Sequence, residues 1–388
     1  MNMRMIIHCR TPGMKNAQFA RNEIVTEVKK RHFNKALLIS DAALDACGVV
    51  SKIKKVLDDA DIPYEIDLDV KPNPTIENVH AGLLLLKKSG ADFIIAVGGG
   101  SVIDTSKAVA VIAANPENED VVSLEGMDKS TNVPLPLLAV PTTAGTGSET
   151  TMDYVITNTE EKRKMACMDS LVVPVAAFLD TEIMATLPLK LTAATAMDAL
   201  THALESYIAK GAFSFSETLS LKAVSLISEN FLKVLESPDN YDVRKELAIA
   251  QFMAGMSFTN VGLGIVHSMA HPLSAFYDVP HGIANALILP YIVKFNADAC
   301  PDKMIELALT MDKNFDKTSD YKAAAEFVSS KITAFNKAAS LPLTLSEINA
   351  KKEDINDLAK SALEDAATPD NPKDVSLEDF INLYTSMF

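Results

Sequence analysis

Residues 93–108 read FIIAVGGGSVIDTSKA, an apolar run followed by three glycines and then by Ser101, which can open a helix. Glycines let a phosphate group approach the backbone, and a helix N-terminus offers free N–H groups with partial positive charge. The spacing differs from the G-x-G-x-x-G of the usual dinucleotide fingerprint. The stretch therefore predicts a strand, a tight turn and a helix, and it leaves open both phosphate binding and a plain structural turn.

The sequence on either side of this stretch repeats the same alternation of strand and helix. Short apolar runs bounded by turn residues predict strands at residues 36–40, 64–70, 93–97, 136–140 and 175–179. Helical patterns lie between them at residues 49–60, 76–89 and 101–114, and residues 154–158 and 163–169 fit an additional hairpin. This alternation predicts an α/β domain with a mostly parallel sheet and helices on its faces.

The second half of the chain has a different composition. After Pro188 it is rich in Ala, Leu, Met, Lys and Glu at helical spacing, with few strand signals. A length of 388 residues also exceeds the usual size of one hydrophobic core. We therefore expect two domains, a nucleotide-binding α/β domain over residues 1–187 and an all-helical metal-binding and catalytic domain over residues 188–388.

Two further features of the first half fit a nucleotide. The loop PTTAGTGSE, residues 141–149, places hydroxyls and glycines after a predicted strand, at the edge of a parallel sheet where ligands bind. Asp41 ends another strand, where a carboxylate can accept hydrogen bonds from an adenosine ribose and repel a 2′-phosphate, which favours NAD over NADP. The alternative for each is a helix N-cap.

The histidines point to a metal. The chain has seven, and all those beyond residue 188 fall in MDALTHALESY (residues 197–207) or GIVHSMAHPLSAFYDVPHG (residues 264–282). Asp198 and His202 are four residues apart, as are His267 and His271, so each pair shares one helix face, and His281 follows. One Asp–His pair is more often a structural hydrogen bond, but this grouping within uncharged sequence favours a metal site.

Imidazole and carboxylate ligands together suit zinc, iron or nickel, and spacing does not choose among them. A cation held by three histidines and one aspartate keeps a coordination position for water or an alcohol oxygen. It lowers the pKa of a bound hydroxyl and polarises a carbonyl. With a nicotinamide cofactor nearby, hydride transfer is the economical prediction.

Taken together, the motifs GGGSVIDTSKA, PTTAGTGSE, MDALTHALESY and GLGIVHSMAHPLSAFYDVPHGIANALILP resemble those of the iron-containing (group III) alcohol dehydrogenase family, over the whole length of the chain. The resemblance implies that Asp198, His202, His267 and His281 ligate the metal, usually Fe²⁺, with Zn²⁺ as the alternative. It places His271 near the nicotinamide as the candidate for proton transfer, with packing as its alternative role. Phe258 is expected either to wall the substrate pocket or to be an ordinary core residue.

The same resemblance implies a set of residues that bind NAD. They are Asp41, Asn73, Gly98, Gly99, Gly100, Ser101, Asp104, Thr142, Thr143, Thr146, Val155, Lys164 and Leu187. Asp104 has an alternative role, which is to charge the first turn of its helix. The family loop often reads T-A-G-T-A/S-E, whereas this chain has Gly147 and Ser148 at that point, and we expect no loss of binding from the change.

The expected activity is the NAD(H)-dependent interconversion of a short primary alcohol or diol and its aldehyde. Lactaldehyde and propane-1,2-diol are the first pair, and ethanol, propanol, butanol and propane-1,3-diol are alternatives within the class. A dehydroquinate synthase-like lyase would need basic residues around the metal, and no Lys or Arg occurs between Leu247 and Val293. A nucleotide-sensing protein without catalysis would not need a complete metal site.

Net charge, apolar segments and cysteines restrict the possible binding partners and the cellular compartment. A net charge of −15 argues against a nucleic-acid partner, since such binding rests on clustered Lys and Arg. Residues 1–10 hold no apolar stretch of signal-peptide length, and residues 130–148 and 252–277, although uncharged or nearly so, do not read as membrane spans. The four scattered cysteines, Cys9 among them, suit a reducing cytosol. We expect a cytoplasmic protein without a membrane partner, assembled as a homodimer or larger oligomer.

Overall fold

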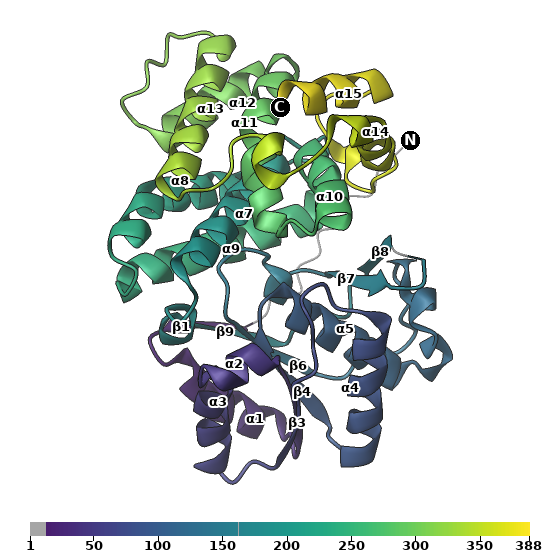
Figure 1. The fold of residues 1–388 in the computed structure, drawn as a ribbon. Coiled ribbons are helices and arrows are strands. Elements are labelled where there is room, and N and C mark those ends of the chain that lie inside the picture. The colour runs from purple at the N-terminus through teal and green to yellow at the C-terminus, as the bar shows by residue number, and fades with distance from the viewer. Residues whose placement is uncertain (1–12, 162) are drawn as a thin grey trace. The chain divides into compact units, whose positions relative to one another are not determined.

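The computed structural model describes residues 13–161 and 163–388, and the chain divides into two compact units, Met1–Leu187 and Pro188–Phe388 (Figure 1). The division coincides with the change of composition along the sequence. The expectations for residues 1–10 and for Cys9 lie outside the described residues.

A parallel sheet forms the centre of the first unit. Its strands, in the order in which they lie side by side, are β1 (Gly13–Ala17), β9 (Ala176–Asp180), β6 (Leu137–Pro141), β4 (Phe93–Gly98), β2 (Ala36–Ile39) and β3 (Tyr64–Asp67). Every neighbouring pair is parallel. The predicted α/β fold with a parallel sheet is confirmed, with β1 as an additional edge strand.

A second, smaller sheet contains the predicted hairpin. Strand β7 (Asp153–Asn158) pairs antiparallel with β8 (Arg163–Met168), and the two-residue strand β5 (Gly126–Met127) pairs with β8 in parallel. Alternate side chains of β7 are buried, including those of Tyr154 and Ile156. The hairpin therefore packs one face against the core of the first unit.

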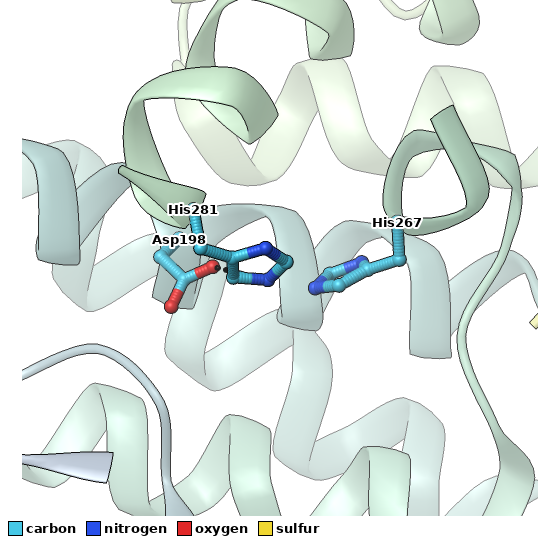
Figure 2. Close-up of side chains that lie close together, drawn as sticks. All are labelled: Asp198, His267 and His281. Atoms are coloured by element: carbon cyan, nitrogen blue, oxygen red, sulfur yellow. Dashed lines mark ion pairs between the residues drawn. The ribbon is translucent and has the colours of Figure 1, made fainter. Parts of the chain in front are cut away.

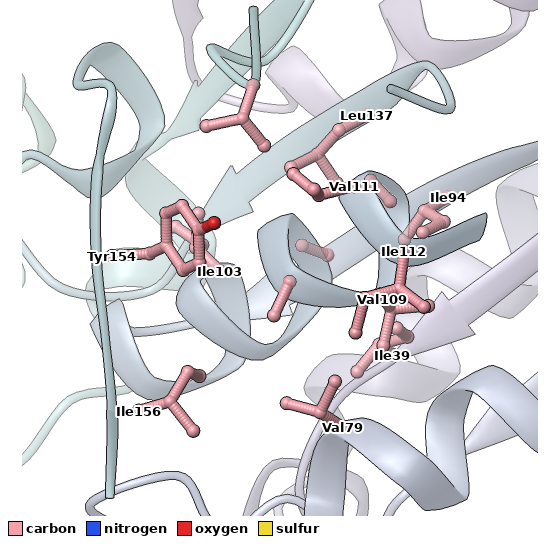
Figure 3. Packing of buried hydrophobic residues seen from close by; sticks show 14 of the residues in the cluster. Ile39, Val79, Ile94, Ile103, Val109, Val111, Ile112, Leu137, Tyr154 and Ile156 are labelled. Atoms are coloured by element: carbon pink, nitrogen blue, oxygen red, sulfur yellow. The ribbon is translucent and has the colours of Figure 1, made fainter. Parts of the chain in front are cut away.

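Helices cover both faces of the parallel sheet, which is why its central strands are continuous apolar runs. They are α1 (Ile24–Arg31), α2 (Ala42–Ala46), α3 (Val49–Asp58), α4 (Ile76–Ser89), α5 (Gly100–Ala114) and α6 (Thr181–Met184). On one face Leu37 and Ile94 pack in one cluster with residues of α4 and α5. Figure 3 shows members of this cluster from the sheet (Ile39, Ile94), from α4 (Val79) and from α5 (Val109). On the other face Leu38 and Ile95 pack with residues of α1 and α3. Successive residues of one strand thus enter opposite cores.

The second unit is entirely helical, as predicted, and no β-strand occurs among residues 188–388. Its α-helices are α7 (Leu189–Ile208), α8 (Ser214–Glu236), α9 (Tyr241–Val261), α10 (Ile265–Tyr277), α11 (His281–Asn296), α12 (Pro301–Met311), α13 (Tyr321–Ala338), α14 (Ile355–Leu363) and α15 (Leu377–Ser386). Within the described residues no single helix is long and apolar enough to cross a membrane, although α9 and α10, bent by 103°, pass that test as a pair.

Candidate functional site

The two glycine-containing loops of the first unit lie against each other at the carboxyl edge of the sheet. Gly98, which ends β4, is in register with Pro141 of β6, and the carbonyl of Gly98 accepts a hydrogen bond of 3.0 Å from the N–H of Thr142. A Cβ atom at Gly100 would lie 2.9 Å from Cγ2 of Thr146, so only glycine allows this approach. The structure therefore brings together the two loops that the sequence assigns to the cofactor.

Asp104 connects these loops to the hairpin. One carboxylate oxygen accepts a hydrogen bond of 2.6 Å from the Ser148 hydroxyl, and the other accepts one of 3.0 Å from the N–H of Val155. Burial raises the pKa of Asp104, against the attraction of the Lys107 ammonium, which lowers it. Both oxygens thus have protein donors, which gives Asp104 a structural role within the candidate cofactor site.

Lys107, one helical turn later, is a residue that the sequence analysis missed. It is fully buried, and its ammonium donates to the carbonyls of Thr151 and Asp153 at 2.8 and 2.7 Å. Burial lowers the pKa of Lys107 to about 8, although the nearby Asp104 carboxylate raises it. Asp104 and Lys107 together fasten the second loop and the start of β7 to helix α5.

The other predicted cofactor residues are spread over the first unit. Asp41 caps α2, with its Oδ1 accepting from the N–H of Leu44 at 2.9 Å, which is the alternative role that the sequence left open. Asn73 is exposed and has a positive φ of 56°, in the turn before α4. Of the remaining residues, Gly99 is the N-cap of α5 and Ser101 lies in its first turn. Thr143 lies in the second loop, Lys164 on β8 and Leu187 after α6.

Three of the four predicted metal ligands converge in the second unit. Asp198 of α7, His267 of α10 and His281 of α11 each offer one ligand atom, and these atoms lie within 4.8 Å of one another (Figure 2). Asp198 Oδ1 and His281 Nε2 are 3.6 Å apart. Asp198 and His267 are each 2% exposed. Segments far apart in the sequence thus place a carboxylate and two imidazoles around one point.

His202 lies beside this group but is not one of the three. Its ring stacks on that of His267, with centroids 4.7 Å apart, and on Phe258, with centroids 4.6 Å apart. His202 is buried, and its Nδ1 has no hydrogen-bond partner among the residues that the structure describes. Phe258, which is 8% exposed, packs on a predicted ligand through this stacking contact with His202.

A divalent cation fits this arrangement. Nitrogen and carboxylate donors together suit iron and zinc. Burial, together with the neighbouring His202, lowers the pKa of His267 well below its usual value, so its imidazole is neutral and retains a lone pair for a cation. Burial raises the pKa of Asp198, so a positive charge beside it would stabilise its carboxylate form.

His271, the candidate for proton transfer, belongs to the same cluster of rings. It stacks on His281 with centroids 5.3 Å apart, and its Nδ1 lies 2.7 Å from a carboxylate oxygen of Asp365. Burial raises the pKa of Asp365, but the hydrogen bond and charge of His271 outweigh it and lower the pKa overall. Asp365 thus fixes the orientation of the His271 ring, leaving Nε2 free to face away from the carboxylate.

Glu205 is a second residue that the sequence analysis missed. It lies seven residues after Asp198, on the same face of α7, and its carboxylate contacts His267 Nδ1 at 2.5 Å and the N–H of Val266 at 2.6 Å. Burial raises the pKa of Glu205 to about 7. A carboxylate on the far nitrogen of a metal-binding histidine fixes its tautomer and ring orientation.

Known proteins share both halves of this architecture. A model described as iron-containing alcohol dehydrogenase matches residues 17–181, and a model of the C-terminal region of the Fe-containing alcohol dehydrogenase family matches residues 192–388. The chain belongs to the iron-containing alcohol dehydrogenase family. It is therefore an oxidoreductase.

Among its relatives in the family, lactaldehyde reductase of Escherichia coli K12 is 44% identical over 361 residues, which cover 93% of this chain and 94% of that protein. The solved structure of a 1,3-propanediol oxidoreductase superposes with a TM-score of 0.94 at 34% identity, covering 97% of this chain and 98% of that one. The sulfoacetaldehyde reductase of Bifidobacterium kashiwanohense, solved in complex with NAD⁺, superposes with a TM-score of 0.88 at 26% identity, covering 97% of each chain.

Proposed function

We propose that this family member is a metal-dependent, NAD(H)-linked alcohol dehydrogenase that interconverts short primary alcohols or diols and their aldehydes. The observation that carries the proposal is the convergence of Asp198, His267 and His281 on one point. Lactaldehyde and propane-1,2-diol are the first substrate pair to test, supported by the name of the relative that is 44% identical. Propane-1,3-diol, ethanol and butanol are the alternatives.

The proposed centre holds Fe²⁺, or Zn²⁺ in its place, on Asp198, His202, His267 and His281. A cation there would lower the pKa of an alcohol hydroxyl and polarise an aldehyde carbonyl. His271, oriented by Asp365, would pass the hydroxyl proton to or from solvent.

The proposed cofactor is NAD, which a structural neighbour binds. Backbone N–H groups at the start of α5 would receive its pyrophosphate. Asp41, the N-cap of α2, keeps its second carboxylate oxygen for a ribose hydroxyl. We also propose a cytoplasmic homodimer or larger assembly, which fractionation and gel filtration would test.

The test begins with protein stripped of metal by a chelator and reloaded separately with Fe²⁺ and Zn²⁺. Each form is assayed with the alcohols and aldehydes named above, with NAD(H) and with NADP(H). His267→Ala should abolish both bound metal and turnover. His80→Ala, at an exposed position on α4, is the matched control and should retain both. Full activity of His267→Ala without bound metal would refute the proposal.

A further inference from the structure

Asn285 is directed at the centre of the three converging ligand atoms. It lies on α11, one helical turn after His281, and its side chain is fully buried. Its amide nitrogen donates to Asp198 Oδ1 at 2.7 Å and lies 3.2 Å from His267 Nε2 and 3.1 Å from His281 Nε2. One N–H₂ group, with two hydrogens to donate, therefore lies within hydrogen-bond distance of all three converging ligand atoms.

The orientation of this amide follows from the chemistry of its neighbours. A neutral histidine with Nδ1–H on a carboxylate presents a lone pair at Nε2, as His267 does toward Asn285. Turning the amide over would place its carbonyl oxygen against the Asp198 carboxylate and that lone pair, which repel it. The nitrogen therefore faces the three atoms.

The other end of the same amide is unsatisfied. Asn285 Oδ1 is buried and has no hydrogen-bond partner in the described part of the chain. Buried polar groups without partners are rare, and each one in a native structure calls for an explanation. The unpaired oxygen lowers the stability that this amide contributes, whereas its nitrogen contacts all three ligand atoms.

A cation and the Asn285 nitrogen cannot be bound by the same three atoms at once. The acceptor nitrogen of a neutral histidine has a single lone pair, which either a cation or an N–H can use, and the amide hydrogens, which carry partial positive charge, repel a cation. We propose that Asn285 is a positioning residue of the metal centre, which holds Asp198, His267 and His281 together through its amide nitrogen and is displaced from them when the metal binds. This inference rests on the proposed function.

The proposal predicts in which direction metal affinity changes when Asn285 is removed. If Asn285 stabilises the metal-free protein more than the loaded one, its removal must tighten metal binding, because the two stabilities and the binding constant form a closed cycle. The free energy of a hydrogen bond to a charged group sets the size of the effect on metal binding. We expect about a tenfold or larger decrease in Kd. Asn285→Ala should therefore bind Zn²⁺ more tightly than the wild type, and its metal-free form should have a lower Tm.

The measurement uses the full-length protein, Zn²⁺ as the probe and a chelating indicator dye in competition. Melting curves of the metal-free and Zn²⁺-loaded forms are recorded alongside. The matched control is Asn230→Ala, a buried asparagine of α8 whose amide donates within its own helix, to the carbonyl of Leu226. Asn230→Ala should lower both melting temperatures equally and leave Kd unchanged.

Each outcome decides between definite alternatives. A lower Kd for Asn285→Ala, with the Tm loss confined mainly to the metal-free form, supports the proposal. An unchanged or higher Kd overturns it, since Asn285 would then be neutral or would stabilise the loaded centre. If the wild type itself binds no Zn²⁺ and no Fe²⁺, the proposed metal centre fails as well, whereas wild-type binding with an unaltered variant removes only this inference.

Discussion

Replacing Gly282 by alanine tests whether the ligand group depends on the close approach of two helices. Gly282 follows His281 in the first turn of α11, where that helix packs on α7. A Cβ atom at this position would lie 2.4 Å from the carbonyl oxygen of Ala194 and 3.3 Å from Cβ of Asp198. Since the nearest atom belongs to the backbone of α7, no side-chain rotation relieves the clash.

The size of the effect follows from these distances. Ordinary van der Waals contact begins at 3.4 Å, so the two helices must separate locally by about 1 Å. Such overpacking costs about 1–3 kcal/mol of unfolding free energy. The same shift moves His281 away from Asp198, and misplacements of ~1 Å in a functional site cost on the order of 100-fold. We expect metal affinity to fall by about 10- to 100-fold.

Metal titration and thermal melting of Gly282→Ala measure both consequences. Gly211→Ala is the control, because a Cβ there meets nothing closer than 3.5 Å and its backbone conformation suits alanine. The control should bind metal and melt like the wild type. If Gly282→Ala also did so, the helices would adjust without moving the ligands, and the packing argument would be wrong.

Two further predictions concern ionisable groups, the partly buried Asp365 and the fully buried Lys107. Asp365→Asn should lower kcat for the alcohol by roughly 100-fold or more while bound metal stays unchanged, because the neutral amide can turn its N–H₂ group toward Nδ1 and so favour the other tautomer of His271, and it carries no charge to stabilise a protonated ring. Loss of metal instead would show that Asp365 supports the ligands. Burial lowers the pKa of Lys107 from 10.5 to about 8, so between these values the folded chain holds fewer protons than the unfolded chain and stability rises with pH. Relative to Lys107→Met, the wild type should therefore gain about 1.5 kcal/mol of unfolding free energy between pH 8 and 9.5, measured by urea denaturation. A difference in unfolding free energy between the two proteins that does not change with pH would contradict the lowered pKa of Lys107.

Much of the first unit could be predicted because its signals are local. Buried parallel strands are apolar runs, and the predicted strand at residues 93–97 differs by one residue from β4. The strand predicted at residues 64–70 is shorter in the structure, where β3 ends at Asp67. Its neighbour in the described sheet is β2, and β2 ends at Ile39, which is paired with Asp67. Strand β1, GMKNA, was not predicted, since it lacks the apolar β-branched run by which the other strands were recognised.

The convergence of Asp198, His267 and His281 could be predicted from their grouping in two short segments of the sequence, whereas the residues that contact them were harder to predict. Glu205 shares the helix face of Asp198 and could have been found from its spacing of seven residues. Asn285 follows His281 at the same i, i+4 spacing as the other pairs, but an asparagine in an apolar helix does not by itself indicate a metal. Asp365 lies 94 residues beyond His271, and only tertiary packing brings them together.

The two carboxylates of α7 show what the structure adds to the sequence pattern. Asp198 and Glu205 lie on one helix face, and each is 2% exposed, so burial penalises both charges. Glu205 meets the N-terminus of α10, where the N–H groups of Gly264 and Val266 donate to it and the helix dipole favours a negative charge. Among the described residues the donor to the Asp198 carboxylate is the Asn285 amide, which it shares with His267 and His281. The protein thus supplies the positive partners of Glu205 from its own backbone, whereas Asp198 remains a carboxylate that a cation can stabilise. We therefore propose Asp198 as the ligand and Glu205 as the residue that orients His267.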